Sequence, residues 1–272
     1  MTTATTDSAA RYEGRRALIT GGGSGIGQAT VFRLLSEGGS VVAADISEEG
    51  LKATVARAEE QGLAARLSTV VVNIAEEDSA RAGVAAAVRT LGGLDVLVNA
   101  AGILRAAHTH EMPLADWNKV LTVNLTGTFL MTREALPELL KNETPVIVNF
   151  SSTSASFAHP YMAAYAASKG AIQSFTHAIA LEYSKQNLRA VSVCPGSISS
   201  GMTDASGTSK ENVGPGFPEH DVDWNLLTKL LPAIGHGFAG PEAVASVVAM
   251  LASEDGKFIT GTEIRIDGGT HM

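Results

Sequence analysis

The stretch YAASK places a phenol at Tyr165 and an ammonium group at Lys169, four residues later. Side chains at this spacing are neighbours on a helix. A free tyrosine has a pKa of about 10, but a fixed positive charge nearby favours the phenolate and lowers that pKa. The pair could therefore act as a general acid/base. Because a tyrosine four residues before a lysine also arises by chance, the rest of the chain must supply the context.

Two polar residues fall among apolar ones in the helices that we expect. An apolar stripe at helical spacing runs along 163–185 through Tyr165, Ile172, Phe175 and Ile179, and Lys169 lies on this stripe. An ammonium group on the core-facing side of a helix is costly unless another group satisfies it. Asn124, in the apolar stretch VLTVNLTG, poses the same problem for an amide. Both side chains are therefore expected to have polar partners within the protein.

A glycine-rich turn, LITGGGSGIGQAT, leads from an expected strand into an expected helix. Gly21, Gly25 and Gly27 are spaced G-x-x-x-G-x-G, which is looser than the common dinucleotide-binding pattern. Glycines at such a turn let a pyrophosphate approach the helix N-terminus, whose free N–H groups favour anions. Taken alone, the turn is also compatible with a tight strand-to-helix connection that binds nothing.

Asp45 ends the next apolar run, VVAAD, 24 residues after Gly21. A carboxylate about 20 residues beyond a glycine loop accepts hydrogen bonds from the adenosine ribose of NAD and repels the 2′-phosphate of NADP. No Lys or Arg lies in the glycine loop or directly after Asp45 to neutralise that phosphate. The pattern favours NAD. The alternative is that Asp45 only caps the following helix, a role for which Ser47 is better placed.

Strand and helix patterns alternate along the chain. Short β-branched runs predict buried strands at 15–20, 40–45, 68–73, 94–99, 145–150, 189–194 and 263–267. Amphipathic patterns predict helices at 25–37, 47–61, 76–91, 115–140, 163–185 and 241–252. The strand runs are too apolar to alternate, as expected of parallel strands covered on both faces. We therefore expect an α/β fold: a doubly wound, seven-stranded parallel sheet with helices on both faces.

One domain accounts for the chain, because no linker or change in composition interrupts the pattern. We expect a flexible N-terminus over 1–13 and a Rossmann-type domain over 14–272. The segments NAAG, SSTS and PGSIS follow three of the strands, at the carboxyl ends where open α/β sheets bind ligands. Residues 197–240, rich in Gly, Ser and Pro, depart from the pattern, and 199–238 is a candidate substrate lid.

Composition limits the classes of molecule that the chain is expected to bind and the compartment in which it is expected to work. The 272-residue chain has a net charge of −8 and no basic cluster, which argues against binding to nucleic acid or to an anionic membrane. Its single cysteine, Cys194, lies in an apolar run and is expected to be a buried structural thiol in a reducing compartment. The N-terminus shows no secretory signal, so a cytoplasmic setting is expected.

Taken together, the motifs resemble those of the short-chain dehydrogenase/reductase family, and the resemblance covers nearly the whole chain. They are TGGGSGIG, DVLVNAAG, Asn124 in its helix, Ser152 thirteen residues before Tyr165, YAASK, PGSI and the terminal IDGG. The length resembles that of the family's short-subunit branch. There are three mild departures: Asn73 where Asp is common, NAAG for NNAG, and Ser200 where Thr is usual.

The resemblance implies a role for each matching residue. Tyr165 would be the catalytic acid/base, and Lys169 would bind the nicotinamide ribose and lower the tyrosine pKa. Ser152 would hydrogen-bond the substrate oxygen, and Asn124 would hold a water that links Lys169 to solvent. The expected cofactor-binding residues are Gly21, Ser24, Gly25, Ile26, Gly27, Asp45, Ile46, Asn73, Ile74, Asn99, Ala100, Gly102, Tyr165, Lys169, Pro195, Gly196, Ile198 and Ser200.

The function expected from these features is the reversible oxidation of a secondary alcohol to a ketone with NAD. An NAD-retaining epimerase or dehydratase, or a non-catalytic nucleotide-binding scaffold, remains an alternative. The substrate is expected to be a small molecule, and no metal is expected. Arg105 could pair with a substrate carboxylate or be a surface arginine, and His159 could touch the substrate, although a loop histidine without a role is the favoured interpretation. The family resemblance also implies a homotetramer, in which helices 115–140 and 163–185 pair with their copies.

Overall fold

Seven parallel strands form one sheet, in the order β3-β2-β1-β4-β5-β6-β7, which confirms the predicted fold class. The structure is a computed structural model and describes residues 10–204, 214–218, 220–235 and 237–272. The strands are β1 (Arg16–Thr20), β2 (Ser40–Asp45), β3 (Leu67–Val71), β4 (Val96–Asn99), β5 (Val146–Phe150), β6 (Arg189–Pro195) and β7 (Glu263–Ile266). Each begins and ends within two residues of the range predicted from the sequence.

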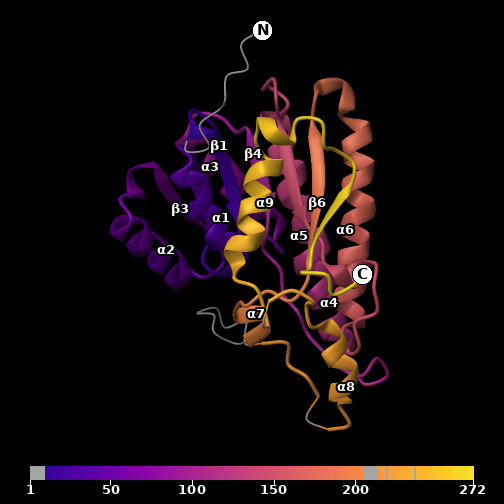
Figure 1. Cartoon of the computed structure of the whole chain (residues 1–272). Coiled ribbons are helices and arrows are strands. Elements are labelled where there is room, and N and C mark those ends of the chain that lie inside the picture. The colour runs from indigo at the N-terminus through magenta and orange to yellow at the C-terminus, as the bar shows by residue number, and fades with distance from the viewer. Residues whose placement is uncertain (1–9, 205–213, 219, 236) are drawn as a thin grey trace.

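Helices cover both faces of this sheet (Figure 1). They are α1 (Gly25–Ser36), α2 (Glu48–Glu60), α3 (Glu77–Leu91), α4 (Leu114–Leu121), α5 (Gly127–Leu139), α6 (Ala163–Glu182), α7 (Gly201–Asp204), α8 (Trp224–Leu227) and α9 (Pro241–Leu251). Helices α1, α2 and α9 pack their apolar residues on one face, and α3, α5 and α6 pack theirs on the other. None of the helices in the described ranges is long and apolar enough to cross a membrane.

Successive strand residues serve the two cores alternately. In β1, Ala17 and Ile19 join the core beneath α1 and α9, whereas Leu18 joins the core beneath α3 and α5. This alternation is the period of two of a β-strand, and burial on both faces explains the unbroken apolar runs. The edge strands differ from the expectation of full burial, since β3 and β7 each expose part of their residues. An edge strand has a neighbour on one side only and receives less cover.

The sheet reverses its winding direction between β1 and β4. From β1 the chain builds outward to β2 and β3, then returns to place β4 on the other side of β1, where Thr20 pairs with Asn99. The carboxyl ends of the strands point toward the end that carries α7 and α8 in Figure 1. A reversal of this kind leaves a crevice at the carboxyl ends, and ligands bind there in open α/β sheets.

The helix predicted over 115–140 is interrupted. A π-helical turn, Thr122–Thr126, separates α4 from α5. Such a turn inserts an extra residue into the helix and is frequent at functional sites. It carries Asn124, whose side-chain Oδ1 accepts a hydrogen bond from the backbone N–H of Ile103 at 2.8 Å. The helical periodicity of the sequence spans the whole range and does not reveal this turn.

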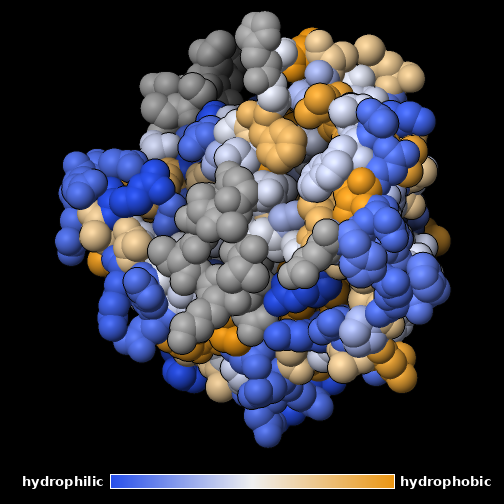
Figure 2. Space-filling view, turned by 90° about the horizontal axis from the view of Figure 1, so that it is seen from below, coloured by the Kyte–Doolittle hydropathy of each residue, from blue (hydrophilic) through white to orange (hydrophobic). Residues whose placement is uncertain are grey.

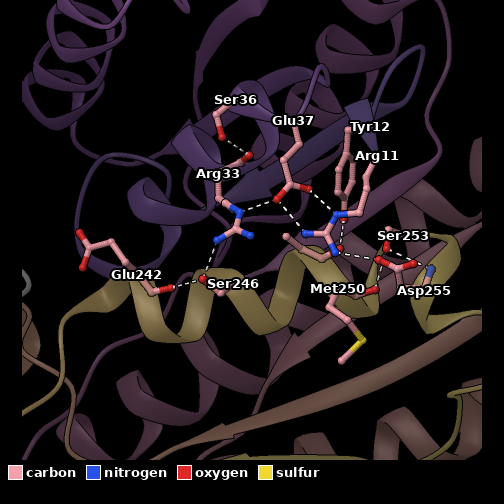
Figure 3. Close-up of polar contacts among 11 residues, drawn as sticks. Arg11, Tyr12, Arg33, Ser36, Glu37, Glu242, Ser246, Met250, Ser253 and Asp255 are labelled. Carbon is pink, nitrogen blue, oxygen red and sulfur yellow. Dashed lines mark hydrogen bonds and ion pairs between the residues drawn. The ribbon is translucent and has the colours of Figure 1, made fainter. Parts of the chain in front are cut away.

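The described end of the N-terminal segment, residues 10–13, is anchored to the domain. Residues 1–9 of the predicted flexible stretch lie outside the described residues. Tyr12 is fully buried, and its hydroxyl donates to the backbone oxygen of Ala249 at 2.7 Å. Arg11 forms ion pairs with Glu37 at 2.7 Å and with Asp255 at 2.8 Å. These contacts tie the segment to α1 and α9 (Figure 3).

Glu37 is the centre of this network. Its buried carboxylate pairs with both Arg11 and Arg33, and Arg33 also donates to the Ser246 hydroxyl on α9. We expect Glu37→Gln to lower the free energy of unfolding by about 3 kcal/mol, because it leaves two guanidinium groups without their shared partner. Urea denaturation measures this change.

The matched control is Glu48→Gln, because Glu48 pairs with Lys52 on the exposed surface of α2. An exposed pair of this kind contributes at most about 0.5 kcal/mol. Equal losses in the two variants would contradict the importance given to the buried network.

Candidate active site

A cavity of about 830 Å³ lies at the carboxyl ends of the strands. It extends from the glycine loop, past Asp45 and the segments that follow β4 and β5, to those that follow β6. Of the site residues predicted from the sequence, those that line it are Gly21, Ser24, Gly25, Ile26, Gly27, Asp45, Ile46, Asn73, Ile74, Ala100, Gly102, Ser152, Tyr165, Lys169, Pro195, Gly196, Ile198 and Ser200. The fold thus brings together residues that are up to 179 positions apart in the chain.

The glycine loop needs glycine for space as well as for conformation. Gly21 has φ +71°, and a Cβ there would lie 2.9 Å from the backbone nitrogen of Ala101. A Cβ at Gly27 would lie only 2.1 Å from the carbonyl oxygen of Gly21. Side chains at these positions would push the loop away from β4 and from the start of α1. The loop therefore keeps a bare backbone at a helix N-terminus, which suits the pyrophosphate of a dinucleotide.

Asp45 joins the glycine loop to the second strand. Its carboxylate accepts hydrogen bonds from the N–H groups of Gly23 and Ser47, both at 2.9 Å. Helix α2 is capped instead by the Ser47 hydroxyl, which accepts from the N–H of Gly50 at 3.0 Å. This confirms that Ser47 is the capping residue. Asp45 lies at the cavity with a conformation fixed by two backbone donors.

Ser152 and Tyr165 both line the cavity, and the Ser152 hydroxyl favours the ionised form of the Tyr165 phenol. The backbone orients Ser152, because its Oγ accepts from the N–H of Ser154 at 3.1 Å in the turn that follows β5. Desolvation raises the pKa of Tyr165 to about 12, and the effect of the Ser152 hydroxyl only partly offsets that rise. This differs from the expected lowering by Lys169, because burial outweighs the other effects on the phenol in the protein alone.

Lys169 has the partner that its position on the helix requires. Its Nζ donates to the backbone oxygen of Phe150, the last residue of β5, at 2.7 Å, and only 3% of the residue is exposed. The ammonium nitrogen lies 5.5 Å from the centre of the Tyr165 ring. A carbonyl oxygen does not neutralise a charge, so desolvation lowers the pKa of Lys169 to about 8.

Asn124 is held in place behind the cavity without lining it. In addition to the bond from Ile103 N–H, its amide nitrogen donates to the Ile103 oxygen at 2.9 Å and to the Ser168 hydroxyl at 3.1 Å. A Cβ on Gly102 would lie 3.2 Å from Asn124 Oδ1 and 3.5 Å from Lys169 Nζ. The absence of a side chain at Gly102 thus leaves these two polar groups facing the same small space.

Asn99 is the second predicted site residue that does not line the cavity. Its amide nitrogen donates to Asn149 Oδ1 at 2.9 Å and to the Thr132 hydroxyl at 3.1 Å, so its side chain joins a buried polar group between β4, β5 and α5. Its own Oδ1 is buried without a partner among the described residues. Contact between Asn99 and a cofactor ribose stays a prediction.

The cavity also has a wall that the motifs do not predict. Ala115, Asn118 and Lys119 of α4, with Thr122 of the π-helical turn, line it. The spacing of 115, 118, 119 and 122 is that of one helix face, so helical periodicity after the NAAG loop is the signal that could have identified them. The two candidate substrate contacts differ in position. His159 lines the cavity, whereas Arg105 does not, and its guanidinium group donates to the backbone oxygen of Leu104 at 2.7 Å.

Cys194 is a buried free thiol, as predicted. Its Sγ accepts a hydrogen bond from the Gln173 amide at 3.3 Å, and burial raises its pKa. In the described ranges, no three or more His, Cys, Asp or Glu side chains are arranged to hold a metal ion.

Comparison with known proteins gives consistent matches over most of the chain. Residues 15–211 match the sequence profile of the short chain dehydrogenase family. The 3-oxoacyl-[acyl-carrier-protein] reductase of Thermotoga maritima is 38% identical, over 95% of this chain and 98% of its own. The 2,5-dichloro-2,5-cyclohexadiene-1,4-diol dehydrogenase of Sphingobium indicum is 35% identical, over 95% and 97%. A short chain dehydrogenase structure from Burkholderia cenocepacia, in complex with NADP, has a TM-score of 0.83 and 30% identity, over 96% and 100%.

The burial of Lys169 predicts a pH-dependent stability. Because its pKa is about 8 in the folded state and about 10.5 when unfolded, folding releases its proton between these values, and stability rises with pH there. Lys169→Met lacks this dependence. At about 1.4 kcal/mol per pH unit, the wild type should gain about 2 kcal/mol relative to the variant between about pH 7 and pH 9.5. Urea denaturation at the two pH values measures the gain, and parallel curves would contradict the lowered pKa.

Proposed function

We propose that this chain, a member of the short chain dehydrogenase family and an oxidoreductase of CH–OH groups, uses NAD as its cofactor. In the proposed reaction it interconverts a secondary alcohol and a ketone. One observation carries the proposal: Ser152 and Tyr165 line the same cavity beside the buried Lys169, and the Ser152 hydroxyl lowers the pKa of the Tyr165 phenol. Two hydroxyl groups held at one point can both meet the oxygen of an alcohol or a ketone.

The cofactor site fits a dinucleotide. A Cβ at Gly21 or Gly27 would fill the space beside the loop, and Asp45 stands at the end of the second strand. We propose that the loop and the N-terminus of α1 hold the pyrophosphate, and that Lys169 meets the nicotinamide ribose. When bound, the nicotinamide supplies the hydride acceptor or donor. The protein supplies orientation and proton transfer.

Tyr165 transfers the proton in this mechanism. With a pKa near 12, the phenol is protonated at neutral pH and is ready to donate to the oxygen of a ketone as hydride arrives. Ser152 donates a hydrogen bond to the same oxygen and stabilises its developing charge. In the oxidation direction Tyr165 must first lose its proton, so alcohol oxidation should accelerate as the pH rises, whereas ketone reduction should not.

Lys169 and Asn124 carry protons between Tyr165 and solvent in this mechanism. The lysine pKa of about 8 lies close to neutrality, so the Nζ group can gain and lose a proton with little free-energy cost. The small space beside Gly102, faced by Asn124 Oδ1 and Lys169 Nζ, is a place where a water could bridge them. We propose this route from Lys169 toward solvent for both directions of the reaction.

The choice of NAD rests on Asp45. Its carboxylate lines the cavity, and two backbone N–H groups hold it in one orientation. The adenosine ribose would therefore lie next to a fixed negative charge. A 2′-phosphate would have to approach that charge, and neither the glycine loop nor the two residues after Asp45 carry a cation to offset the repulsion.

We also propose a cytoplasmic homotetramer. Large apolar side chains on the helices expected to pair with their copies are exposed in the single chain: Leu114 of α4, Phe129 of α5 and Leu181 of α6. Burial of these side chains against a second copy would remove them from water. The single free thiol suits a reducing compartment.

Replacement of the phenol tests the mechanism. Tyr165→Phe should lower kcat for alcohol oxidation with NAD by about 100-fold or more, because the proton acceptor is lost. NADH absorbance during turnover of a panel of secondary alcohols measures this effect. Tyr183→Phe is the matched control, because Tyr183 follows the same helix and does not line the cavity. Full activity in Tyr165→Phe would overturn the mechanism.

The role of Asp45 predicts cofactor preference. Asp45→Asn keeps the shape and one acceptor oxygen but removes the charge, so the ratio of kcat/KM for NAD to that for NADP should fall by about tenfold or more. The exposed Glu49→Gln on α2 also removes one negative charge, and it should leave the ratio unchanged. A wild-type enzyme that prefers NADP would refute the assignment of NAD.

A further inference from the structure

The segment that follows β6 brings several large apolar side chains to the cavity. Four of them, Phe217, Trp224, Leu227 and Leu231, we call the roof. They come from the described parts of the expected lid, from α8 and from the turns on either side of it. The rest of the substrate end is also apolar, since the buried side chains of Ile103, Leu104 and Met162 line the same cavity.

Hydrogen bonds fix the backbone of this segment to the domain. The N–H of Ala106, in the loop after β4, donates to the Pro215 oxygen at 2.8 Å. The Ser197 hydroxyl, just after β6, donates to the Leu230 oxygen at 2.7 Å. The segment is thus attached on two sides, and the roof has a defined place over the cavity.

Tyr161 makes a third attachment at a cost in backbone strain. Its φ of +68° lies in the left-handed region, which a residue with a bulky side chain rarely adopts. In this conformation the Tyr161 hydroxyl accepts a hydrogen bond from the N–H of Asp223 at 2.8 Å. The backbone carbonyl oxygen of Tyr161 accepts a second bond, from the N–H of Ala107 at 2.9 Å. Its ring packs edge to face on Phe217, which in turn packs on Trp224. The strain is sustained by contacts that position the roof.

Part of the roof is still exposed to solvent. Trp224 is 62% exposed and Leu231 is 52% exposed, although both line the cavity. Figure 2 shows the molecule from this end, where apolar surface lies among the hydrophilic side chains. Exposed apolar side chains that gather at the mouth of a cavity gain free energy when an apolar molecule covers them.

Charged groups at the cavity do not favour an anionic substrate. The cationic side chains that line it in the described ranges are Lys119 and Lys169, and both have interactions within the chain. His159 also lines the cavity, but burial, together with His271, lowers its pKa to about 4, so it is neutral at physiological pH. A carboxylate or phosphate entering beneath the roof would lose its hydration without a matching cation.

We propose that the substrate is a bulky, uncharged secondary alcohol or ketone whose hydrocarbon body lies beneath the roof. This inference rests on the proposed function, because it places the reacting oxygen at Ser152 and Tyr165. It selects against small hydroxy acids, phosphorylated sugars and other anionic substrates.

Reduction of three ketones by NADH tests the inference: 2-decalone, which is bicyclic and uncharged; butanone, which is small and uncharged; and 3-oxobutanoate, which is small and anionic. We expect kcat/KM for 2-decalone to exceed that for either small ketone by about 100-fold. Comparable values for the three ketones, or a preference for 3-oxobutanoate, would overturn the inference and leave the proposed function intact. Failure to reduce any of the three, with NADH still bound, would refute the proposed function itself.

Variants of the roof locate the cause of the preference. Leu227→Ala and Trp224→Ala should lower the ratio of kcat/KM for 2-decalone to that for butanone by about fivefold or more, because each removes apolar surface that only the larger ketone reaches. The control is Leu226→Ala, since Leu226 precedes Leu227 in α8 but does not line the cavity. Thermal melts establish that the variants fold. An unchanged ratio in both folded roof variants would overturn the placement of the substrate.

Discussion

The buried ammonium group of Lys169 is the constraint on which the site depends. Burial of a charge is unfavourable unless polar groups meet it. The protein meets it with the carbonyl at the end of β5, and the Ser151 hydroxyl, one residue further, holds the backbone oxygen of Lys169 at 2.9 Å. Helix α6 is thereby fastened to the end of β5 at the point where Tyr165 must reach Ser152. The interaction that satisfies the charge also holds Tyr165 and Ser152 at the same cavity.

The same constraint accounts for the interrupted helix between α4 and α5. A regular helix would present its residues without a break, but the π-helical turn at Thr122–Thr126 places Asn124 where its amide bonds both backbone groups of Ile103. That pair of bonds fixes the chain just after Gly102, against the lysine. Two elements distant in sequence, the loop after β4 and the turn before α5, are thus locked together around one small polar space.

The sequence was sufficient to predict the sheet, most helix boundaries and the clustering of the site, because apolar periodicity and strand-end positions are local signals that parallel topology brings to one edge. It was insufficient where the outcome depends on tertiary packing. The π-helical turn, the anchoring of Tyr12 and the inward position of Asn99 all depend on partners far along the chain. The sign of the Tyr165 pKa shift was also missed, because spacing reveals the neighbouring lysine but not the burial that outweighs it.

The two pKa shifts at the site have one cause and opposite directions, and this has a chemical consequence. Desolvation disfavours charge, so it raises the pKa of the Tyr165 phenol and lowers that of the Lys169 ammonium group. Both changes favour a neutral phenol beside an amine that releases its proton near neutrality. An arriving ligand that brings charge or polar groups to this space shifts both equilibria at once. The protein alone therefore keeps the tyrosine as an acid, and the charge distribution of the bound complex decides when it can become a base.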